Sequence, residues 1–172
     1  MNLAPEIYTP LMVIFRLAHI FGAMIWFGFG LYNYFVVSRV DTNMSATAIN
    51  YQLGVAKYTK FGEIMGAAAG STALAGLLLW AINGSKYGTG AGVIILGIGS
   101  LFGLAAVGHG MGIGKRNGEL STAILAAEND GVVNPESYSV INAMIAKLNR
   151  SSNVSLGLMA VAFVCMVSYS QF

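Results

Sequence analysis

The sequence predicts an all-α integral membrane protein, a bundle of four transmembrane helices, on two observations. Of its 172 residues, 56% are hydrophobic and only 9% are charged, whereas a soluble domain carries roughly a quarter charged residues. The apolar residues fall into four long runs, and a helix of about 20 apolar residues crosses a bilayer. At this length one domain is expected, so residues 1–172 should form a single transmembrane domain.

The four runs predict spans at about residues 11–37, 62–82, 90–113 and 154–170. The first span exceeds the ~20 residues that a bilayer requires, so we expect it to tilt or to protrude. Pro10 is well placed at its start, because proline is favoured in the first turn of a helix. The segment before it lacks the basic stretch and cleavage site of a signal peptide, so this span is expected to be retained.

The basic residues predict the orientation of the bundle. With four spans, both ends of the chain lie on one side. One side also carries the two long loops and most of the basic residues, Arg39, Lys57, Lys60, Lys115, Arg116, Lys147 and Arg150, while the other has Lys86 and Arg16. By the positive-inside rule the long loops are cytoplasmic, and the N and C termini and the turn at residues 83–89 are exterior. The expected location is the bacterial inner (cytoplasmic) membrane, with several passes.

The second long loop is expected to contain an amphipathic cytoplasmic helix. Asn134, Pro135 and Glu136 supply a cap, a first-turn proline and a first-turn acid. Apolar residues follow at helical spacing, namely Tyr138, Ile141, Met144, Ile145 and Leu148. This helix should lead into the fourth span and lie at the membrane surface or against a partner. Residues 118–128 are expected to extend the third span, with a turn at residues 129–131.

Small residues recur at steps of three or four positions in two spans. They are Gly62, Gly66 and Gly70 in the second span, and Gly99, Gly103, Ala106 and Gly110 in the third. Such stripes allow helix backbones to approach closely, which matters because lipid provides no hydrophobic drive for helices to associate. Close helix packing is the expected role, and the alternative is that the glycines make room for a flat cofactor.

The first span concentrates the polar groups that are costly in a membrane and therefore candidates for function. Steps of three or four residues place them on one stripe, which should face the bundle interior: Arg16, His19, Gly22, Trp26, Gly30 and Asn33. His19 lies roughly 12 Å inside the exterior end, deep enough to need a partner. Its imidazole can ligate a haem iron or another metal, hydrogen-bond to a neighbouring helix, or relay protons. Arg16 can pair with a haem propionate or extend to lipid phosphate.

The second histidine, His109, lies in a glycine-rich stretch near the cytoplasmic end of the third span. Counting ~1.5 Å per residue leaves the two histidines about 15 Å apart along the membrane normal. They are therefore poor candidates for the two axial ligands of one haem. The glycines around His109 fit either a ring system or the end of a helix.

Several other classes of function are disfavoured. The net charge of +2 and the scattered basic residues indicate no nucleic-acid partner. No phosphate-binding loop, nucleophile elbow or zinc spacing is present, so whether the chain is an enzyme stays open, and any chemistry would come from a bound cofactor. The nine methionines do not cluster as a copper path would require.

Residues 16–28, RLAHIFGAMIWFG, resemble a known family. A first span with histidine, six residues, tryptophan, one residue and glycine is similar to the opening of small bacterial membrane proteins of the copper-resistance D type. Membrane-bound protoporphyrinogen oxidase and the membrane segment of cytochrome-linked urate oxidase have similar openings. In the haem-binding relatives the first-span histidine is an axial ligand, so the resemblance implies that role for His19.

These observations lead to two hypotheses. The first is a membrane protein that binds b-type haem and takes part in electron transfer, alone or as a subunit of a larger redox complex. Its candidate cofactor-binding residues are His19, Arg16, Trp26 and His109, with His19 as the metal ligand. The second is a cofactor-free structural or accessory subunit of a respiratory, photosynthetic or oxygenase complex. Both imply contact with the lipid bilayer and with protein partners in the membrane.

Overall fold

The computed structural model describes residues 5–43, 45–83, 90–129 and 135–169, and within these ranges no strand occurs. The chain forms helices in the order α1 (Pro5–Tyr32), a π-helical turn η1 (Asn33–Val37), α2 (Ser38–Asn43), α3 (Ser45–Tyr58), α4 (Phe61–Asn83), α5 (Ala91–Asn129) and α6 (Pro135–Ser168). The expected turns at residues 83–89 and 129–131 and the cap residue Asn134 lie at or beyond the edges of the described ranges.

Four helical stretches are long and apolar enough to cross a membrane, as the sequence predicts: Tyr8–Val40, Phe61–Asn83, Ala91–Ala127 and Ser137–Ser168. Each contains one of the four expected spans or nearly all of it. Their large apolar side chains are widely exposed, including Met24, Leu101 and Val164. A water-soluble bundle would bury these groups, so this surface fits contact with lipid.

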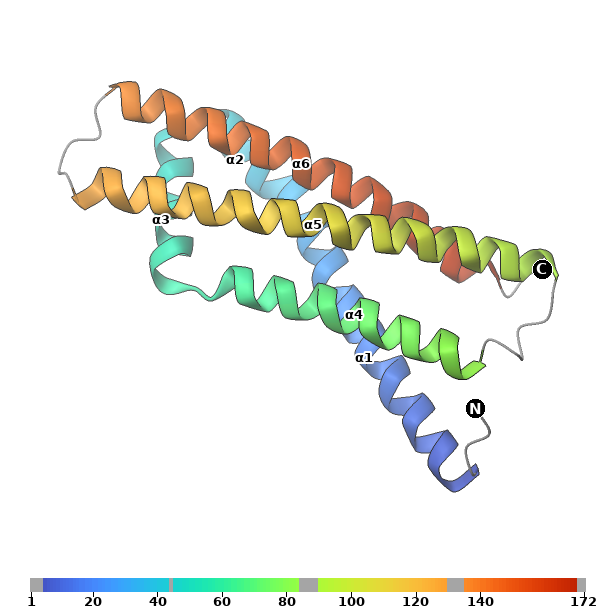
Figure 1. The fold of residues 1–172 in the computed structure, drawn as a ribbon. Coiled ribbons are helices and arrows are strands. Elements are labelled where there is room, and N and C mark those ends of the chain that lie inside the picture. Colours follow the sequence, from blue (N-terminus) through green and yellow to red (C-terminus); the bar gives the residue numbers. More distant parts are fainter. Residues whose placement is uncertain (1–4, 44, 84–89, 130–134, 170–172) are drawn as a thin grey trace.

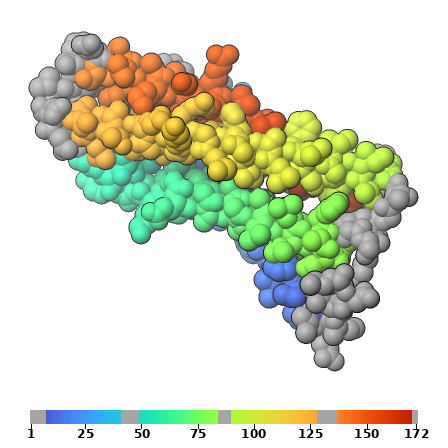
Figure 2. All heavy atoms as spheres, viewed as in Figure 1, coloured from blue at the N-terminus to red at the C-terminus, as the bar shows by residue number. Residues whose placement is uncertain are grey.

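The helices are arranged as two unequal pairs (Figure 1). Helices α5 and α6 lie side by side (Figure 1), and Figure 2 shows the first part of α6 packed along α5. Helix α1 packs mainly on α4, which in turn contacts α5. Helix α1 is inclined to the other three long helices, α4, α5 and α6 (Figure 1). The short helix α3 lies across one end of the bundle. We call this end the α3 end.

Small residues bring α5 and α6 together. A Cβ atom added at Gly99 would lie 2.7 Å from Cβ of Cys165 and 3.2 Å from the carbonyl oxygen of Ala162. Ala106, two turns further along α5, is completely buried. At Gly99 and Ala106 the stripe of the third span therefore serves close helix packing, as expected, because any larger side chain at Gly99 would push the two backbones apart.

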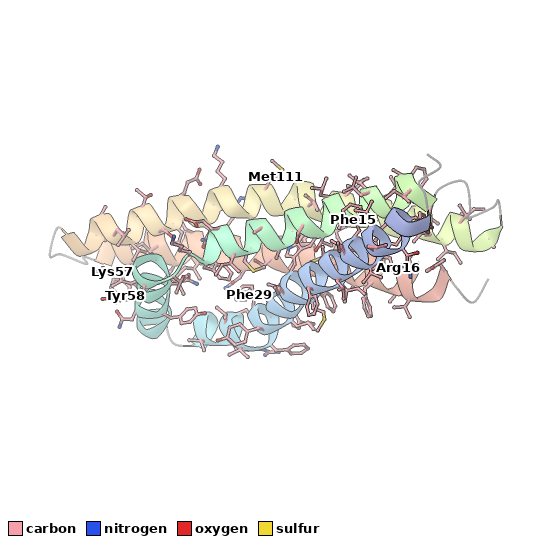
Figure 3. All side chains as sticks on the ribbon, turned by 90° about the horizontal axis from the view of Figure 1, so that it is seen from below. Phe15, Arg16, Phe29, Lys57, Tyr58 and Met111 are labelled. Carbon is pink, nitrogen blue, oxygen red and sulfur yellow. The ribbon has the colours of Figure 1, made fainter. Side chains whose placement is uncertain are left out.

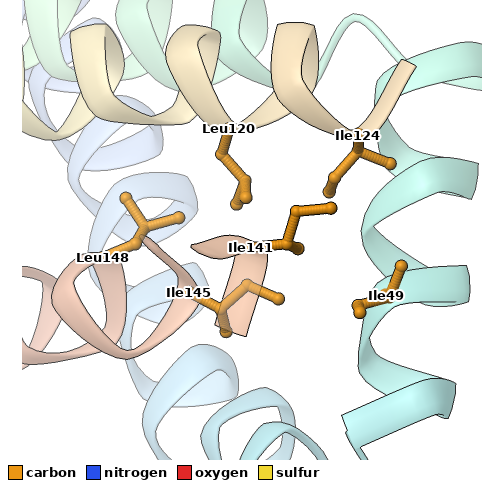
Figure 4. Packing of buried hydrophobic residues seen from close by; sticks show 6 residues of the cluster. All are labelled: Ile49, Leu120, Ile124, Ile141, Ile145 and Leu148. Atoms are coloured by element: carbon orange, nitrogen blue, oxygen red, sulfur yellow. The ribbon is translucent and has the colours of Figure 1, made fainter. Parts of the chain in front are cut away.

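Helices α5 and α6 are too long to lie wholly within a bilayer. Helix α5 has 39 residues and so measures about 58 Å, against a hydrocarbon core of about 30 Å. At the α3 end the two helices enclose a hydrophobic core with α3 (Figure 4). This core contains Ile49, Leu120, Ile124, Ile141, Ile145 and Leu148.

This core corrects the expectation for the amphipathic helix. The segment is helical and continuous with the fourth span, as predicted. Its apolar stripe, however, does not need the membrane surface or a partner, because Ile141, Ile145 and Leu148 are buried against α5 and α3 of the same chain. The prediction failed because residues 45–58 were treated as loop, although they form the helix that supplies the third wall.

The start of the first span also differs from the prediction. Helix α1 begins at Pro5, so Pro10 lies inside the helix and not at its first position. At its other end the helix widens into the π-turn Asn33–Val37. Single π-turns inside α-helices are rare and occur often at functional sites. The widened turn sits on the polar stripe of the first span, since Asn33 is its first residue.

The close contact of α5 and α6 can be tested with a matched pair of glycine variants. We expect Gly99→Ala to lower the free energy of unfolding by about 1–3 kcal/mol, because the added methyl group meets Cβ of Cys165 and the backbone of Ala162. Gly97→Ala, two residues away with open space around it, should be neutral or stabilising by up to about 1 kcal/mol. Unfolding in mixed micelles measures both. Equal effects of the two variants would contradict the packing described.

Candidate functional site

The polar stripe of the first span faces other helices along most of its length. Gly22 is buried against α4, where an added Cβ would lie 2.8 Å from the carbonyl oxygen of Ala68. Trp26, Gly30 and Asn33 line a cavity further toward the α3 end. The prediction that this stripe faces the bundle interior is therefore confirmed for these positions.

Arg16 is the exception on this stripe, because its side chain is exposed. It lies on the part of α1 far from the α3 end, whereas Lys57 of α3 lies at the opposite end of the bundle (Figure 3). An exposed guanidinium at this level is free to meet an anionic group at the membrane surface, either a lipid phosphate or a carboxylate of a bound cofactor.

His19 makes a hydrogen bond between helices. Its Nδ1 atom lies 2.7 Å from the carbonyl oxygen of Thr72 on α4. A carbonyl oxygen only accepts, so Nδ1 carries the proton and donates it, which leaves the lone pair on Nε2. The ring rests on Gly76, where an added Cβ would lie 2.9 Å from Cε1 of His19. The helix contact thus fixes both the position of the imidazole and its tautomer.

His109 makes the equivalent contact between α5 and α6 with the other ring nitrogen. Its Nε2 atom lies 3.1 Å from the carbonyl oxygen of Ser151, so Nε2 donates and Nδ1 keeps the lone pair. Arg116, two turns further along α5, donates to the hydroxyl of the same Ser151. Ser151 is 8% exposed, so this pair of contacts ties the two helices together where they leave their apolar spans.

A cavity of about 430 Å³ lies between α1, α3, α4, α5 and α6. It falls within the range of about 300–1,000 Å³ that is common for small-molecule sites. The apolar part of its wall includes aromatic side chains and thioethers, namely Trp26, Phe29, Tyr51, Phe61, Met65, Met111 and Met159. The polar part consists of Asn33, Gln52, Asn117, Ser152 and Ser155. No acidic, basic or histidine side chain is among the lining residues, so the site suits an uncharged molecule.

The glycine stripe of the second span lines this cavity. Gly62, Gly66 and Gly70 have nothing within 4 Å of an added Cβ, and all three are part of the cavity wall. Close packing against another helix of this chain, the expected role, is therefore wrong for this stripe. The alternative, that the glycines make room for a flat cofactor, stays a prediction. Gly114 of α5, in the neighbouring wall, also has open space around it, and Gly110 lies next to Trp26.

Neither histidine lines the cavity. Among the residues that the structure describes, no three histidine, cysteine, aspartate or glutamate side chains gather to hold a metal ion. The hydrogen bond from Nδ1 leaves Nε2 of His19 as the nitrogen that could hold a metal, since ligating histidines commonly donate their other N–H to a backbone carbonyl. The four site residues predicted from the sequence thus lie at separate places. Arg16 is on the surface, and Trp26 lines the cavity. His19 of α1 contacts α4, and His109 of α5 contacts α6.

Sequence reasoning did not find the polar wall of the cavity as a site. Ser152 and Ser155 were passed over because isolated serines in a span have little chemistry of their own. Gln52 was hidden because the helix α3 that carries it was not expected. The only available signal was the run Ser151, Ser152, Asn153 and Ser155, which interrupts the apolar pattern as the fourth span begins.

Comparisons with protein-family models, with curated proteins and with solved structures found no match.

The two histidines should have opposite neutral tautomers, and this can be measured. We expect ¹⁵N NMR of histidine-labelled protein, with both rings in their neutral forms, to show the proton on Nδ1 of His19 and on Nε2 of His109. The variants His19→Gln and His109→Gln assign the two signals. The Nε2–H tautomer is the usual one for a free imidazole, so finding it at His19 would contradict the contact with Thr72.

Proposed function

We propose that this chain is a membrane protein that binds b-type haem through His19 and takes part in electron transfer, alone or as a subunit of a larger redox complex. The observation that supports this proposal best is the hydrogen bond from Nδ1 of His19 to the carbonyl oxygen of Thr72. It holds the imidazole in the tautomer that has its lone pair on Nε2, the atom that would bind iron.

The surrounding residues would orient the ligand and the group it holds. A bound haem supplies reversible one-electron oxidation and reduction. Thr72 fixes the rotation of the His19 ring, and Gly76 allows the ring to lie against α4. Arg16, one turn before His19 on α1, would offer an exposed cation to a haem propionate. The resemblance of residues 16–28 to the copper-resistance D type of membrane protein points to the same role for His19.

We also propose an orientation and a location for the bundle. Seven basic residues would lie on the cytoplasmic side by the positive-inside rule, the side that would hold the α3 end: Arg39, Lys57, Lys60, Lys115, Arg116, Lys147 and Arg150. Both termini would then be exterior, and the membrane would be the inner membrane of a bacterium. His19, on the half of α1 away from the α3 end, would lie toward the exterior face.

A second candidate function is that of a structural subunit without a cofactor. It is favoured by the fact that both histidines already make hydrogen bonds between helices, His19 to Thr72 and His109 to Ser151. A histidine that only joins two helices needs no further partner. In this case the widely exposed apolar surface of the bundle would contact other membrane subunits as well as lipid.

The haem proposal is tested by a visible spectrum of the protein purified in mild detergent, with a pyridine haemochrome assay. We expect a reduced-minus-oxidised b-type spectrum with about one haem per chain, and loss of the Soret band in His19→Ala. The matched control is His109→Ala, which removes the other interhelical histidine and should keep the haem of His19.

Three results would contradict the proposal in different ways. A correctly folded, colourless protein that co-purifies with other membrane proteins would support the structural subunit. A Soret band that survives in His19→Ala would show that another residue ligates the haem. A haem content that falls by half in His109→Ala would show a second haem at His109.

The orientation is tested by labelling single cysteines in whole cells. In a Cys165→Ala background, the exposed positions Tyr169, at the end of α6, and Thr122, on the extension of α5, are each replaced by cysteine. We expect a membrane-impermeant maleimide to label Tyr169→Cys in intact cells and Thr122→Cys only after lysis. The reverse pattern would invert the proposed orientation and leave the fold unaffected.

A further inference from the structure

Two residues of the cavity wall each carry a buried polar atom that has no hydrogen-bond partner. These atoms are Nδ2 of Asn33, in the π-turn that ends α1, and Oγ of Ser155, on α6. Ser155 is only 3% exposed, and both residues line the cavity. The π-turn that carries Asn33 contacts α6, the helix that carries Ser155. Buried donors in native proteins are nearly always satisfied, and such orphaned groups indicate a missing partner.

We propose that this cavity binds a flat, uncharged ring that carries carbonyl oxygens, a molecule of the quinone class, and that a ring carbonyl accepts hydrogen bonds from Asn33 and Ser155. The inference goes beyond the proposed haem site. It rests on the cavity alone and does not depend on a cofactor at His19.

The α4 part of the cavity wall favours a flat ligand. Gly62, Gly66 and Gly70 of α4 leave a surface without side chains, and nothing lies within 4 Å of an added Cβ at any of them. Trp26 and Phe29 of α1 add aromatic surface. A planar ring can lie against bare backbone on one side and against aromatic rings on another, as ligand sites in membrane bundles require little polarity beyond a few oriented groups.

The donors and the absence of charge explain why the ligand is a neutral acceptor. The amide nitrogen of Asn33 can only donate, and the hydroxyl of Ser155 can donate as well. An acidic ligand would find no cation among the lining residues. An acyl chain of a phospholipid would fill the space but would offer no acceptor, so both polar atoms would remain unsatisfied. A ring carbonyl satisfies them and keeps the rest of the molecule apolar.

Binding can be followed through Trp26, which lines the cavity and lies next to Gly110. The only other tryptophan, Trp80, is 53% exposed on α4 and is removed as Trp80→Phe. The probes are a short-chain benzoquinone and a short-chain naphthoquinone, titrated into the purified protein in detergent, since quinone rings quench indole fluorescence on contact. We expect saturable quenching of Trp26, and the tighter of the two probes identifies which kind of membrane quinone the site prefers.

A matched pair of variants separates the cavity from simple partitioning into the micelle. Gly114→Leu fills the cavity wall and should weaken binding at least about tenfold, since the isobutyl group occupies the site. Gly112→Leu, on the same helix and also with open space around it, does not line the cavity and should bind normally. Thermal unfolding of both variants confirms that they fold.

Ser155→Ala tests the hydrogen bond itself. Without a ligand its hydroxyl has no partner, so the variant should fold with unchanged or higher stability, while quinone binding weakens about two- to tenfold. Absence of saturable quenching by either probe would overturn the proposal, as would equal quenching in Gly114→Leu and Gly112→Leu. Unchanged binding in Ser155→Ala would overturn the assignment of Ser155 as a donor.

Discussion

The tight pairing of α5 and α6 is the contact on which the rest of the bundle depends. In a bilayer, helices gain nothing from hiding apolar surface, so their association rests on how closely the backbones can approach. Gly99 against Cys165 and the buried Ala106 provide that approach. At the α3 end the same two helices, together with α3, enclose a hydrophobic core that contains Leu120 and Ile145. The pair of helices α5 and α6 is therefore held by two kinds of packing, close backbone contact at Gly99 and burial of large apolar side chains at the α3 end.

Helix α1 and helix α4 use the same principle over only part of their lengths. Gly22 meets the backbone of Ala68, and the His19 ring fills the space above Gly76. Toward the α3 end the glycines of α4 meet nothing, and the cavity takes the place of a helix contact. The polar stripe of α1 thus passes from a packed half that contains His19 to an open half that contains Trp26 and Asn33. One face of one helix carries both candidate sites.

The sequence predicted the number of spans and their approximate limits, because long apolar runs and helical periodicity are local signals. It also identified the inward face of α1 from spacing alone. It could not tell packed glycines from open ones, since Gly66 and Gly99 have the same spacing and differ only in what lies opposite. Helix α3 was missed because its apolar pattern is weak. Thr72 and Ser151, the hydrogen-bond partners of His19 and His109, were missed because they accept through backbone carbonyls, which every residue carries. The π-turn has no known sequence signal.

The make-up of the cavity wall decides what could occupy it. Most of the wall is apolar, while two of its residues, Asn33 and Ser155, each carry a buried polar atom without a hydrogen-bond partner. Water would satisfy Asn33 and Ser155 but would wet the apolar surfaces of Phe29, Met65 and Met159, and lipid would do the reverse. A molecule that is apolar over most of its surface and accepts hydrogen bonds at one edge removes both costs together.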